Sequence, residues 1–391
     1  GHPWVYSNEI EGSFRGLEKG QPAVLQDATG KFLAHGYVNP NSLISFRAVS
    51  RVEEETDALG PAGLERRLHS AWIHRRTLGR DAYSFRLCFG EADSLPGLIV
   101  DVWRVGVSAE NASAVFAVQA HSAGADRWMN DLPTVLKKLA AQFLGAAVKV
   151  AVVARNDVSV RKLEGITMDE PCWLTPVLAD LKPGQTPLWI RSAQEKAPIA
   201  IQCDWFSGQK TGFFLDQADN VATLIQRLSD AGAAAFAGKT VQVIDLCCYV
   251  GQWSAQLAAF FKSHGIDAHF TLVDASSEAL AFAETNVRRA GASKVECLKR
   301  DVLHELENLP AGGFDVVISD PPGLVKSRKD LGAGTHAYLQ LHTQAIRLTR
   351  PGGWLAACSC SGLLPEEDFA GTLAKAGARN GTLIRWFARG G

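Results

Sequence analysis

The spacing of hydrophobic and polar positions changes along the chain and divides it into regions. From Trp4 to about Ser50, short apolar runs such as AVLQD, KFLAHGYV and LISFRAV are separated by glycines and by the turn at Asn39. Short runs bounded by turn residues predict a small β-barrel. From about Gly63 to Leu78, apolar residues recur at helical spacing, which predicts an amphipathic helix.

Further apolar runs follow in the middle of the chain. LIVDVW, SAVFAVQAH and VKVAVVAR flank a helical pattern near Ala125 to Leu144, an arrangement typical of an α+β unit. The stretch from Thr175 to Pro198 is rich in proline and glycine and has little periodicity, so we expect a linker or loop there.

From Val241 onward, strand and helix patterns alternate regularly. The strand patterns are VQVIDLC, HFTLVDA, VECLKRD, FDVVISD, WLAACSC and TLIRWFA, with helices predicted between them. This alternation predicts a doubly wound parallel sheet. The fold class is therefore α/β, and we expect three domains, at residues 1–55, 63–185 and 199–391.

Composition narrows the class of protein. A chain of 391 residues exceeds one hydrophobic core, and 47% apolar with 21% charged residues fits a globular protein. No apolar run reaches the roughly 18 residues of a membrane span, and no secretory leader precedes Trp4, so we expect a cytoplasmic protein without membrane contact. The eight cysteines lack zinc-ligand spacing, which predicts no metal site. Because the net charge is only −1, a nucleic acid would have to bind local basic patches.

Four predicted strands of the C-terminal region end in an aspartate. They are Asp245, Asp274, Asp301 and Asp320. An isolated aspartate there is more often a helix N-cap, but four at one sheet edge favour a ligand site. Asp274 follows Gly251 at roughly the 20 residues expected of a ribose-binding acid, and Asp301 could accept from an adenine amino group. Gly251 without the other glycines of G-x-G-x-x-G disfavours a dinucleotide.

Motifs along nearly the whole chain resemble the ribosomal RNA large subunit methyltransferase I family, the cytosine-5 type. GHPWVYSNEI and GYVNPNSLISFRAVS resemble its PUA-like RNA-binding domain, GEADSLPGLIVD and RNDVSVRKLEG its central domain, and GQKTGFFLDQADN, DPPGLVKSRKDL and CSCSG its catalytic part. The resemblance implies a Rossmann-like methyltransferase domain using S-adenosylmethionine (SAM), with 23S ribosomal RNA as partner and a homodimer as one option. The expected cofactor-binding residues are Lys210, Thr211, Phe214, Asp216, Asp245, Tyr249, Gly251, Asp274, Ala275, Asp301, Val302 and Asp320. Gln252 and Gly323-Leu324 depart from the family pattern.

Methylation of cytosine at carbon 5 requires a cysteine thiol as nucleophile. Carbon 5 of cytosine is a poor nucleophile, so its methylation generally needs a thiolate that adds at carbon 6. Cys358 and Cys360 are predicted on one face of the WLAACSC strand, about 6.6 Å apart. Cys360, nearer the carboxyl end, is the expected nucleophile, although a small buried thiol is the alternative. Asp320 is expected to bind the base edge, and both water and Asp320 are candidates for the group that removes the carbon 5 proton.

Other functions fit parts of the same pattern. Asp-Pro-Pro also resembles the motif of enzymes that methylate exocyclic amines or guanine N7 without a thiol, and a non-catalytic RNA-binding protein with a degenerate fold is a further alternative. Lys326, Arg328 and Lys329 follow this motif and are expected to bind RNA, with a solvated loop as the alternative. The basic residues of the helix at 63–78 are more simply explained as a solvated face. The modified nucleotide is not predicted by the sequence.

Overall fold

The contacts of the chain divide it into two units, which are described separately. The structure, a computed structural model, describes residues 2–12, 16–194, 197–232, 236 and 238–390. The first unit comprises Gly1–Arg191 and Cys203–Leu215, and the second comprises Ser192–Gln202 and Asp216–Gly391. No helix among these described ranges is both long and apolar enough to cross a membrane.

The first unit begins with an antiparallel sheet of four strands. These are β1 (Trp4–Tyr6), β2 (Gln21–Gln26), β3 (Phe32–Val38) and β4 (Ile44–Ser50), in the order β1-β4-β3-β2, with the 3-10 helix η1 (Ser7–Glu9) after β1. Along β2, half-buried and exposed residues alternate, because successive side chains of a strand point to opposite faces. Ala34, Val38 and Phe46 form the core of this sheet.

A second, larger sheet follows in the same unit, with the order β10-β6-β7-β8-β9 and with β5 paired to β6. Its strands are β5 (Phe85–Phe89), β6 (Leu98–Val105), β7 (Ser113–Ala120), β8 (Val150–Ala154), β9 (Cys172–Trp173) and β10 (Leu188–Ile190). Its helices are α1 (Pro61–Thr77), η2 (Gly90–Asp93), α2 (Ala123–Arg127), η3 (Trp128–Asn130), α3 (Leu132–Leu144) and α4 (Val160–Leu163). Every residue of β7 is buried, and Trp72 on α1 stacks on Phe143 with ring centroids 4.9 Å apart.

Two predictions for this region need correction. The helix expected near residues 125–144 is interrupted before α3, because proline is not accepted in a helix interior. Pro133 instead lies in the first turn of α3, where its missing N–H is tolerated. The expected linker at residues 175–198 contains β10, which pairs antiparallel with β6 through Leu188 and Val105. Leu188 and Ile190 are buried, so the apolar pair outweighs the flanking prolines and glycine.

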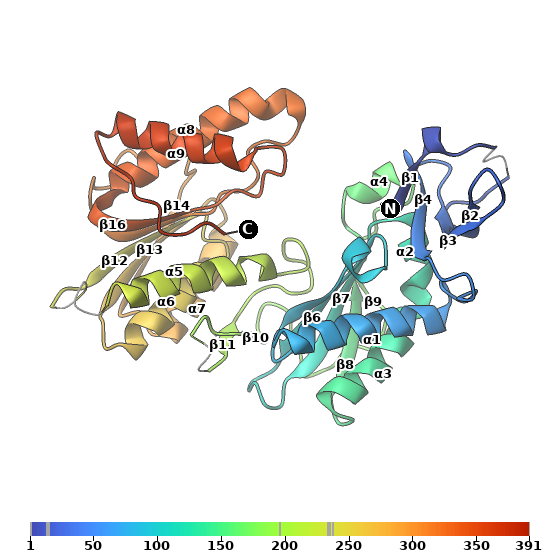
Figure 1. The fold of residues 1–391 in the computed structure, drawn as a ribbon. Helices are drawn as coiled ribbons and strands as arrows, with labels where there is room; N and C mark the ends of the chain where they lie inside the picture. The colour runs from blue at the N-terminus through green and yellow to red at the C-terminus, as the bar shows by residue number, and fades with distance from the viewer. Residues whose placement is uncertain (1, 13–15, 195–196, 233–235, 237, 391) are drawn as a thin grey trace. The chain divides into compact units, whose positions relative to one another are not determined.

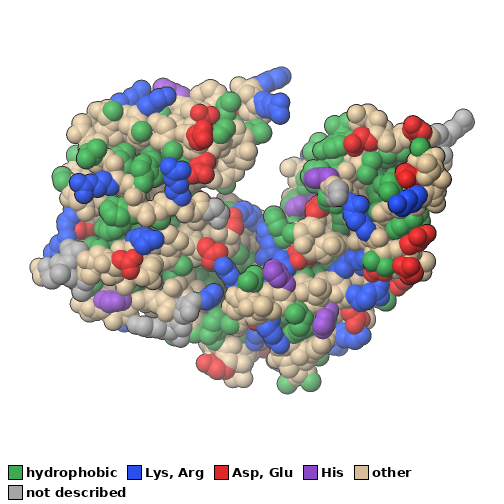
Figure 2. Space-filling view, in the orientation of Figure 1, with side chains coloured by type: hydrophobic (Ala, Val, Ile, Leu, Met, Phe, Trp, Pro, Cys, Tyr) green, Lys and Arg blue, Asp and Glu red, His purple; other side chains and the backbone are tan. Residues whose placement is uncertain are grey.

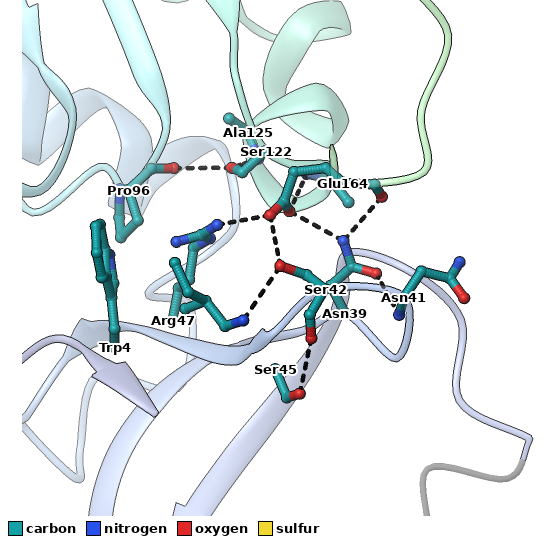
Figure 3. A network of polar contacts seen from close by, with 12 residues as sticks. Trp4, Asn39, Asn41, Ser42, Ser45, Arg47, Pro96, Ser122, Ala125 and Glu164 are labelled. Carbon is teal, nitrogen blue, oxygen red and sulfur yellow. Dashed lines mark hydrogen bonds and ion pairs between the residues drawn. The ribbon is translucent and has the colours of Figure 1, made fainter. Parts of the chain in front are cut away.

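A buried polar network joins the N-terminal sheet to the end of α4 (Figure 3). Glu164, at the end of α4, accepts hydrogen bonds from Asn39 at 2.9 Å, Ser42 at 2.8 Å and Arg47 on β4 at 2.6 Å. Burial raises the pKa of Glu164, but Arg47, Asn39 and Ser42 outweigh it and lower that pKa. The charge is therefore retained in a buried position because cation and donors surround it.

The second unit is a parallel sheet covered by helices on both faces. The strands β12 (Val241–Leu246), β13 (Ala268–Asp274), β14 (Lys294–Lys299), β15 (Phe314–Ser319) and β16 (Thr349–Ala357) lie in the order β14-β13-β12-β15-β16. The other elements are β11 (Ile199–Ile201), η4 (Leu215–Gln217), α5 (Ala218–Asp230), α6 (Gln252–Ser263), α7 (Ser277–Ala290), η6 (Arg328–Asp330), α8 (Leu331–Leu348) and α9 (Glu366–Arg379). Figure 1 shows α8 and α9 on one face of this sheet and α5, α6 and α7 on the other. The predicted doubly wound sheet is confirmed.

The strand predicted at TLIRWFA is absent. Residues 382–390 form no strand, and the chain instead folds against its own unit: Ile384 lies beside Gly377 of α9, and the rings of Phe387 and Trp354 are 4.8 Å apart. A strand needs a hydrogen-bonding neighbour, and in the described part of the chain β16 pairs only with β15. Alternating apolar residues alone therefore misled the prediction.

Candidate active site

The carboxyl ends of the central strands bring Asp274 and Asp320 to either side of one turn. The turn follows β12 and spans Cys247 to Gly251. The Asp274 carboxylate accepts the backbone N–H of Tyr249 at 2.9 Å, and the Asp320 carboxylate accepts the indole N–H of Trp253 at 3.2 Å. β12 is flanked by β13 and β15 in parallel, so this arrangement follows directly from the strand order.

The turn has an unusual backbone. Cys247, Tyr249 and Gly251 adopt φ values of 65°, 48° and 78°, all in the left-handed region that non-glycine residues seldom occupy. At Gly251 a side chain would also be crowded, because a Cβ there would lie 3.1 Å from the Cα of Ala283. Strain of this kind persists where the surroundings impose it, commonly at ligand sites. Gln252, which departs from the family pattern, is buried and begins α6.

All four predicted aspartates influence this turn. Burial raises the pKa of the Cys247 thiol, and the charges of Asp274, Asp245, Asp320 and Asp301 raise it further. Asp301 is exposed and caps its own loop by accepting the N–H of Leu303 at 2.8 Å. The neighbouring Val302 packs into the core of the sheet, while Ala275 is exposed beside Asp274. All four carboxylates thus lie near enough to Cys247 to raise the pKa of its thiol.

Asp245 lies beneath the turn and is almost fully buried. One oxygen accepts the hydroxyl of Ser254 at 2.7 Å, and the other has no hydrogen-bond partner among the described residues. Burial raises its pKa to about 7, opposed by the Ser254 hydrogen bond and helped by the charges of Asp320 and Asp274. An incompletely satisfied buried carboxyl is costly and is typical of functional sites.

The segment GQKTGFFLDQ contributes four of the expected cofactor residues. Lys210, Thr211 and Phe214 belong to the first unit, and Asp216 belongs to the second. The Lys210 ammonium lies 4.2 Å from the centroid of the Phe214 ring, and Thr211 is buried with its hydroxyl 2.5 Å from the Asp101 carboxylate. The role of these residues toward a cofactor therefore rests on the family resemblance.

The two thiols do not share a strand face, which corrects the prediction. β16 ends at Ala357, and Cys358 and Cys360 lie in the irregular segment that follows. The pairing with β15 ends there, where the N–H of Cys358 donates to the carbonyl of Ser319 at 2.8 Å. Cys360 is exposed, and its sulfur lies 3.9 Å from the carbonyl oxygen of Pro321. Burial and the charge of Asp320 raise the pKa of Cys358, so that thiol stays neutral. Of the two, Cys360 has the access that a nucleophile needs.

The loop after Asp320 combines space and positive charge. A Cβ built on Gly323 would lie 3.5 Å from the Cys360 sulfur, so the glycine leaves room beside the thiol. Lys326, Arg328 and Lys329 are exposed at the end of this loop, before α8. Elsewhere on the visible surface, Lys and Arg side chains are interspersed with acidic and uncharged ones (Figure 2), in keeping with the small net charge.

The structure favours the simpler explanation of the basic helix α1. Arg66 and Arg67 pair with Glu55 at 2.7 and 2.9 Å, Arg75 pairs with Asp93, and Arg76 pairs with Asp81 at 2.7 Å. These cations are largely neutralised by carboxylates of their own unit. They are therefore weaker candidates for RNA contact than the loop at residues 326–329.

Two site residues were not predicted from the sequence. Trp253 holds the Asp320 carboxylate, and the fully buried Asn286 on α7 donates to the carbonyls of Val250 at 2.9 Å and Gln202 at 2.8 Å. The Gln202 N–H returns a hydrogen bond to the Asn286 oxygen at 2.7 Å. A polar amide on the otherwise apolar face of a predicted helix was the available signal for Asn286, and Trp253 had none.

Comparisons with known families and structures agree with this architecture. Residues 1–51 match the family described as PUA-like domain, and residues 237–383 match a methyltransferase domain. A solved chain described as a methyltransferase complexed with SAH is similar over 96% of this chain and 86% of its own length, with a TM-score of 0.67 and 15% identity. A SAM-dependent methyltransferase described from Streptococcus mutans gives a TM-score of 0.65 at 14% identity over the same shares. These structures support the fold.

Curated relatives extend the match along the sequence. The chain is 32% identical over 381 residues, 96% of its length, to the ribosomal RNA large subunit methyltransferase I of Klebsiella pneumoniae, of which it covers 84%. It is 31% identical to the protein of the same name from Serratia proteamaculans, covering 98% of this chain and 88% of the relative. Because it has a methyltransferase domain and these relatives, the protein is a SAM-dependent methyltransferase. The chain belongs to the ribosomal RNA large subunit methyltransferase I family.

Proposed function

We propose that this protein methylates carbon 5 of a cytosine in 23S ribosomal RNA, with Cys360 as nucleophile. The observation that carries the proposal is the position of the exposed Cys360 thiol. Its sulfur lies beside the carbonyl of Pro321, the residue that follows the strand-end Asp320. The names of the curated relatives support a large-subunit ribosomal RNA substrate. A thiol at this position is what cytosine-5 chemistry needs and what amine or guanine-N7 methylation does not use.

The residues around the turn fit SAM. Gly251 has no side chain, so the backbone can approach the cofactor closely there. The Asp274 carboxylate suits the ribose hydroxyls, and the Asp301 carboxylate suits the adenine amino group. We assign Asp245, Tyr249, Ala275, Val302 and Asp320 to the walls of the same site, and Lys210, Thr211, Phe214 and Asp216 by resemblance. When bound, the cofactor supplies an electrophilic methyl group.

The reaction then follows from three groups. The Cys360 thiolate would add to carbon 6 of the cytosine and make carbon 5 nucleophilic. Carbon 5 would then accept the methyl group, whose bond to the cofactor sulfur would break and leave a neutral thioether. Asp320, whose carboxyl accepts the Trp253 indole N–H at 3.2 Å, would carry a proton that it donates to N3 while its other oxygen accepts from the amino group, and so would stabilise the negative charge that develops at N3. Loss of the carbon 5 proton to a base then restores the double bond and expels the thiolate.

The function is tested on cellular RNA. In cells that lack this protein, bisulfite sequencing of ribosomal RNA should show one cytosine of the large subunit converted that is protected in the parent strain. Re-expression of the full chain should restore the protection, because the methyl group at carbon 5 blocks deamination. An identical bisulfite pattern in both strains would contradict the cytosine-5 assignment.

The ribose assignment predicts a selective loss of cofactor affinity. Asp274→Ala removes a charged acceptor worth about 1.5 to 3 kcal/mol, so SAM should bind roughly 10- to 150-fold more weakly. Calorimetric titration measures this, with RNA affinity as the control that should stay the same. Unchanged SAM affinity would exclude Asp274 from the ribose.

The basic loop predicts a change in salt dependence. We infer that Lys326, Arg328 and Lys329 contact phosphates of the strand that carries the target base, which must leave its stack to reach Cys360. Changing all three to glutamine should weaken RNA binding and flatten the slope of log affinity against log salt by about 0.7 for each phosphate no longer neutralised. A variant with the same changes at Arg66, Arg67 and Arg76 is the matched control, and equal slopes in both variants would leave the loop merely solvated.

A further inference from the structure

Tyr338 lies behind the segment that carries Cys360 and contacts both of its flanking serines. The residue is fully buried on α8, with its ring centroid 5.5 Å from that of Phe369. Its hydroxyl accepts the hydroxyl of Ser359 at 2.8 Å and lies 3.0 Å from the hydroxyl oxygen of Ser361. Cys360 is the residue between these two serines. One buried hydroxyl thus contacts the side chains of the residues on either side of the thiol.

The same hydrogen bonds reach the Asp-Pro-Pro loop. The backbone N–H of Val325 donates to the Ser361 oxygen at 3.1 Å, and the N–H of Ser361 donates to the Ser359 oxygen at 3.2 Å. A consistent set of donors runs from Ser359 through Tyr338 to Ser361. The Cys360 segment and the loop after Asp320 are therefore fastened to each other at Ser361.

Side-chain hydrogen bonds matter here because the ladder has ended. β16 stops at Ala357, so Ser359, Cys360 and Ser361 lack the strand pairing that fixes the residues before them. A nucleophile on irregular backbone reacts efficiently only if its neighbours hold it in place. The fully buried ring of Tyr338 gives the two serines a fixed point of attachment.

We propose that Tyr338 is a positioning residue of the reaction: through Ser359 and Ser361 it holds the Cys360 thiol against the loop of Pro321 to Val325. The inference rests on the proposed role of Cys360 as nucleophile. The Tyr338 hydroxyl positions the Cys360 segment, and the Tyr338 ring only packs in the core. Tyr338→Phe separates the two, because it keeps the ring against Phe369 and removes only the hydroxyl.

The test compares Tyr338→Phe with a matched variant. Tyr37 is also buried, and its hydroxyl also makes two hydrogen bonds, to the Pro96 carbonyl and the Ser122 hydroxyl, both at 2.8 Å, but it lies in the first unit. Tyr338→Phe should lower kcat about 100-fold, the loss expected from a displacement of about 1 Å, with KM for SAM unchanged. Adduct formation with 5-fluorocytidine RNA at saturating RNA should slow by the same factor. Tyr37→Phe should change neither rate more than about twofold.

Each outcome decides one claim. If Tyr338→Phe turns over at the wild-type rate, or no more slowly than Tyr37→Phe, while Cys360→Ala is inactive, the positioning role fails and the nucleophile stands. If Cys360→Ala still methylates, the proposed function fails and the inference fails with it. Should Tyr338→Phe not fold, the exposed Ser359→Ala carries the same measurement, and wild-type kcat in that variant would overturn the proposal.

Discussion

Replacing Cys360 by alanine is expected to abolish methylation and, with it, covalent trapping on RNA that contains 5-fluorocytidine. In the proposed reaction the thiolate adds at carbon 6, and fluorine cannot leave carbon 5 as a cation, so the wild-type adduct should survive denaturing electrophoresis when SAM is present. A loss of at least about 10³-fold in kcat is expected for removal of a nucleophile that acts in concert with its site. A gel-shift assay and a methyl-transfer assay measure the two effects.

Cys358→Ala is the matched control, because Cys358 lies two residues away and its pKa is raised by burial. That variant should still be trapped, and Cys360→Ala should still bind SAM, since in the proposed reaction the thiol contacts the base and not the cofactor. Trapping that survives in Cys360→Ala but disappears in Cys358→Ala would transfer the nucleophile to Cys358. If neither variant loses methylation, the guanine-N7 or amine alternative replaces the cytosine-5 assignment.

Asp245→Asn is expected to stabilise the cofactor-free protein increasingly as the pH rises. The folded pKa of Asp245 is about 7 against 3.8 for an ordinary aspartate, so the native state keeps a proton that the unfolded chain releases. The contribution of this group to stability is therefore fully present below pH 3.8 and is lost as the pH rises to about 7. Between these two pH values, the contribution of Asp245 to the free energy of unfolding falls by about 4 kcal/mol. Urea unfolding of both proteins between about pH 4.5 and 8 measures it, and a difference independent of pH would contradict it.

His342 supplies a control with the opposite sign. It is fully buried on α8, its Nδ1 lies 2.9 Å from the Thr372 hydroxyl, and burial lowers its pKa to about 4. Here the unfolded chain takes up the proton, so stability is lost as the pH falls from 6.5 toward 4, by about 3 kcal/mol. His342→Gln should remove that loss and leave the Asp245 effect intact. Because the two contributions oppose each other in the wild type, only the difference between variant and wild type reveals each one.

The sequence predicted the catalytic fold more fully than its edges. The alternation of strands and helices from Val241 onward, and the aspartates at four strand ends, follow from periodicity and from the rule that parallel strands end at one edge. The prediction of a strand at residues 382–390 was wrong because periodicity does not say whether a neighbour is available for pairing. β10 was missed because short apolar pairs among prolines resemble a loop.

The contacts around the site depended on chain geometry that no local pattern encodes. The hydroxyl of Tyr338 and the two serines around Cys360 come from α8 and from the segment after β16, and their meeting is fixed by tertiary packing. The end of β16 before Cys358 likewise places both thiols on irregular backbone, although periodicity predicted them on one face of a strand. Residue types at strand ends could be predicted, but their hydrogen-bond partners could not.

The Glu164 network has a consequence for dissection of the protein. A protein that began after residue 55 would lack Asn39, Ser42 and Arg47 together. It would keep Glu164, the carboxylate that these three residues surround. If a replacement sheet lacked only the Arg47 cation, the Glu164 carboxylate would stay buried and unpaired, which costs about 3 to 5 kcal/mol, a large share of the stability of an ordinary domain. Gly124 adds a steric lock, since its Cα lies so close to the Tyr37 ring that a Cβ would overlap it. The N-terminal sheet is thus not a detachable module, and swapping it between homologues requires exchanging α4 and α2 as well.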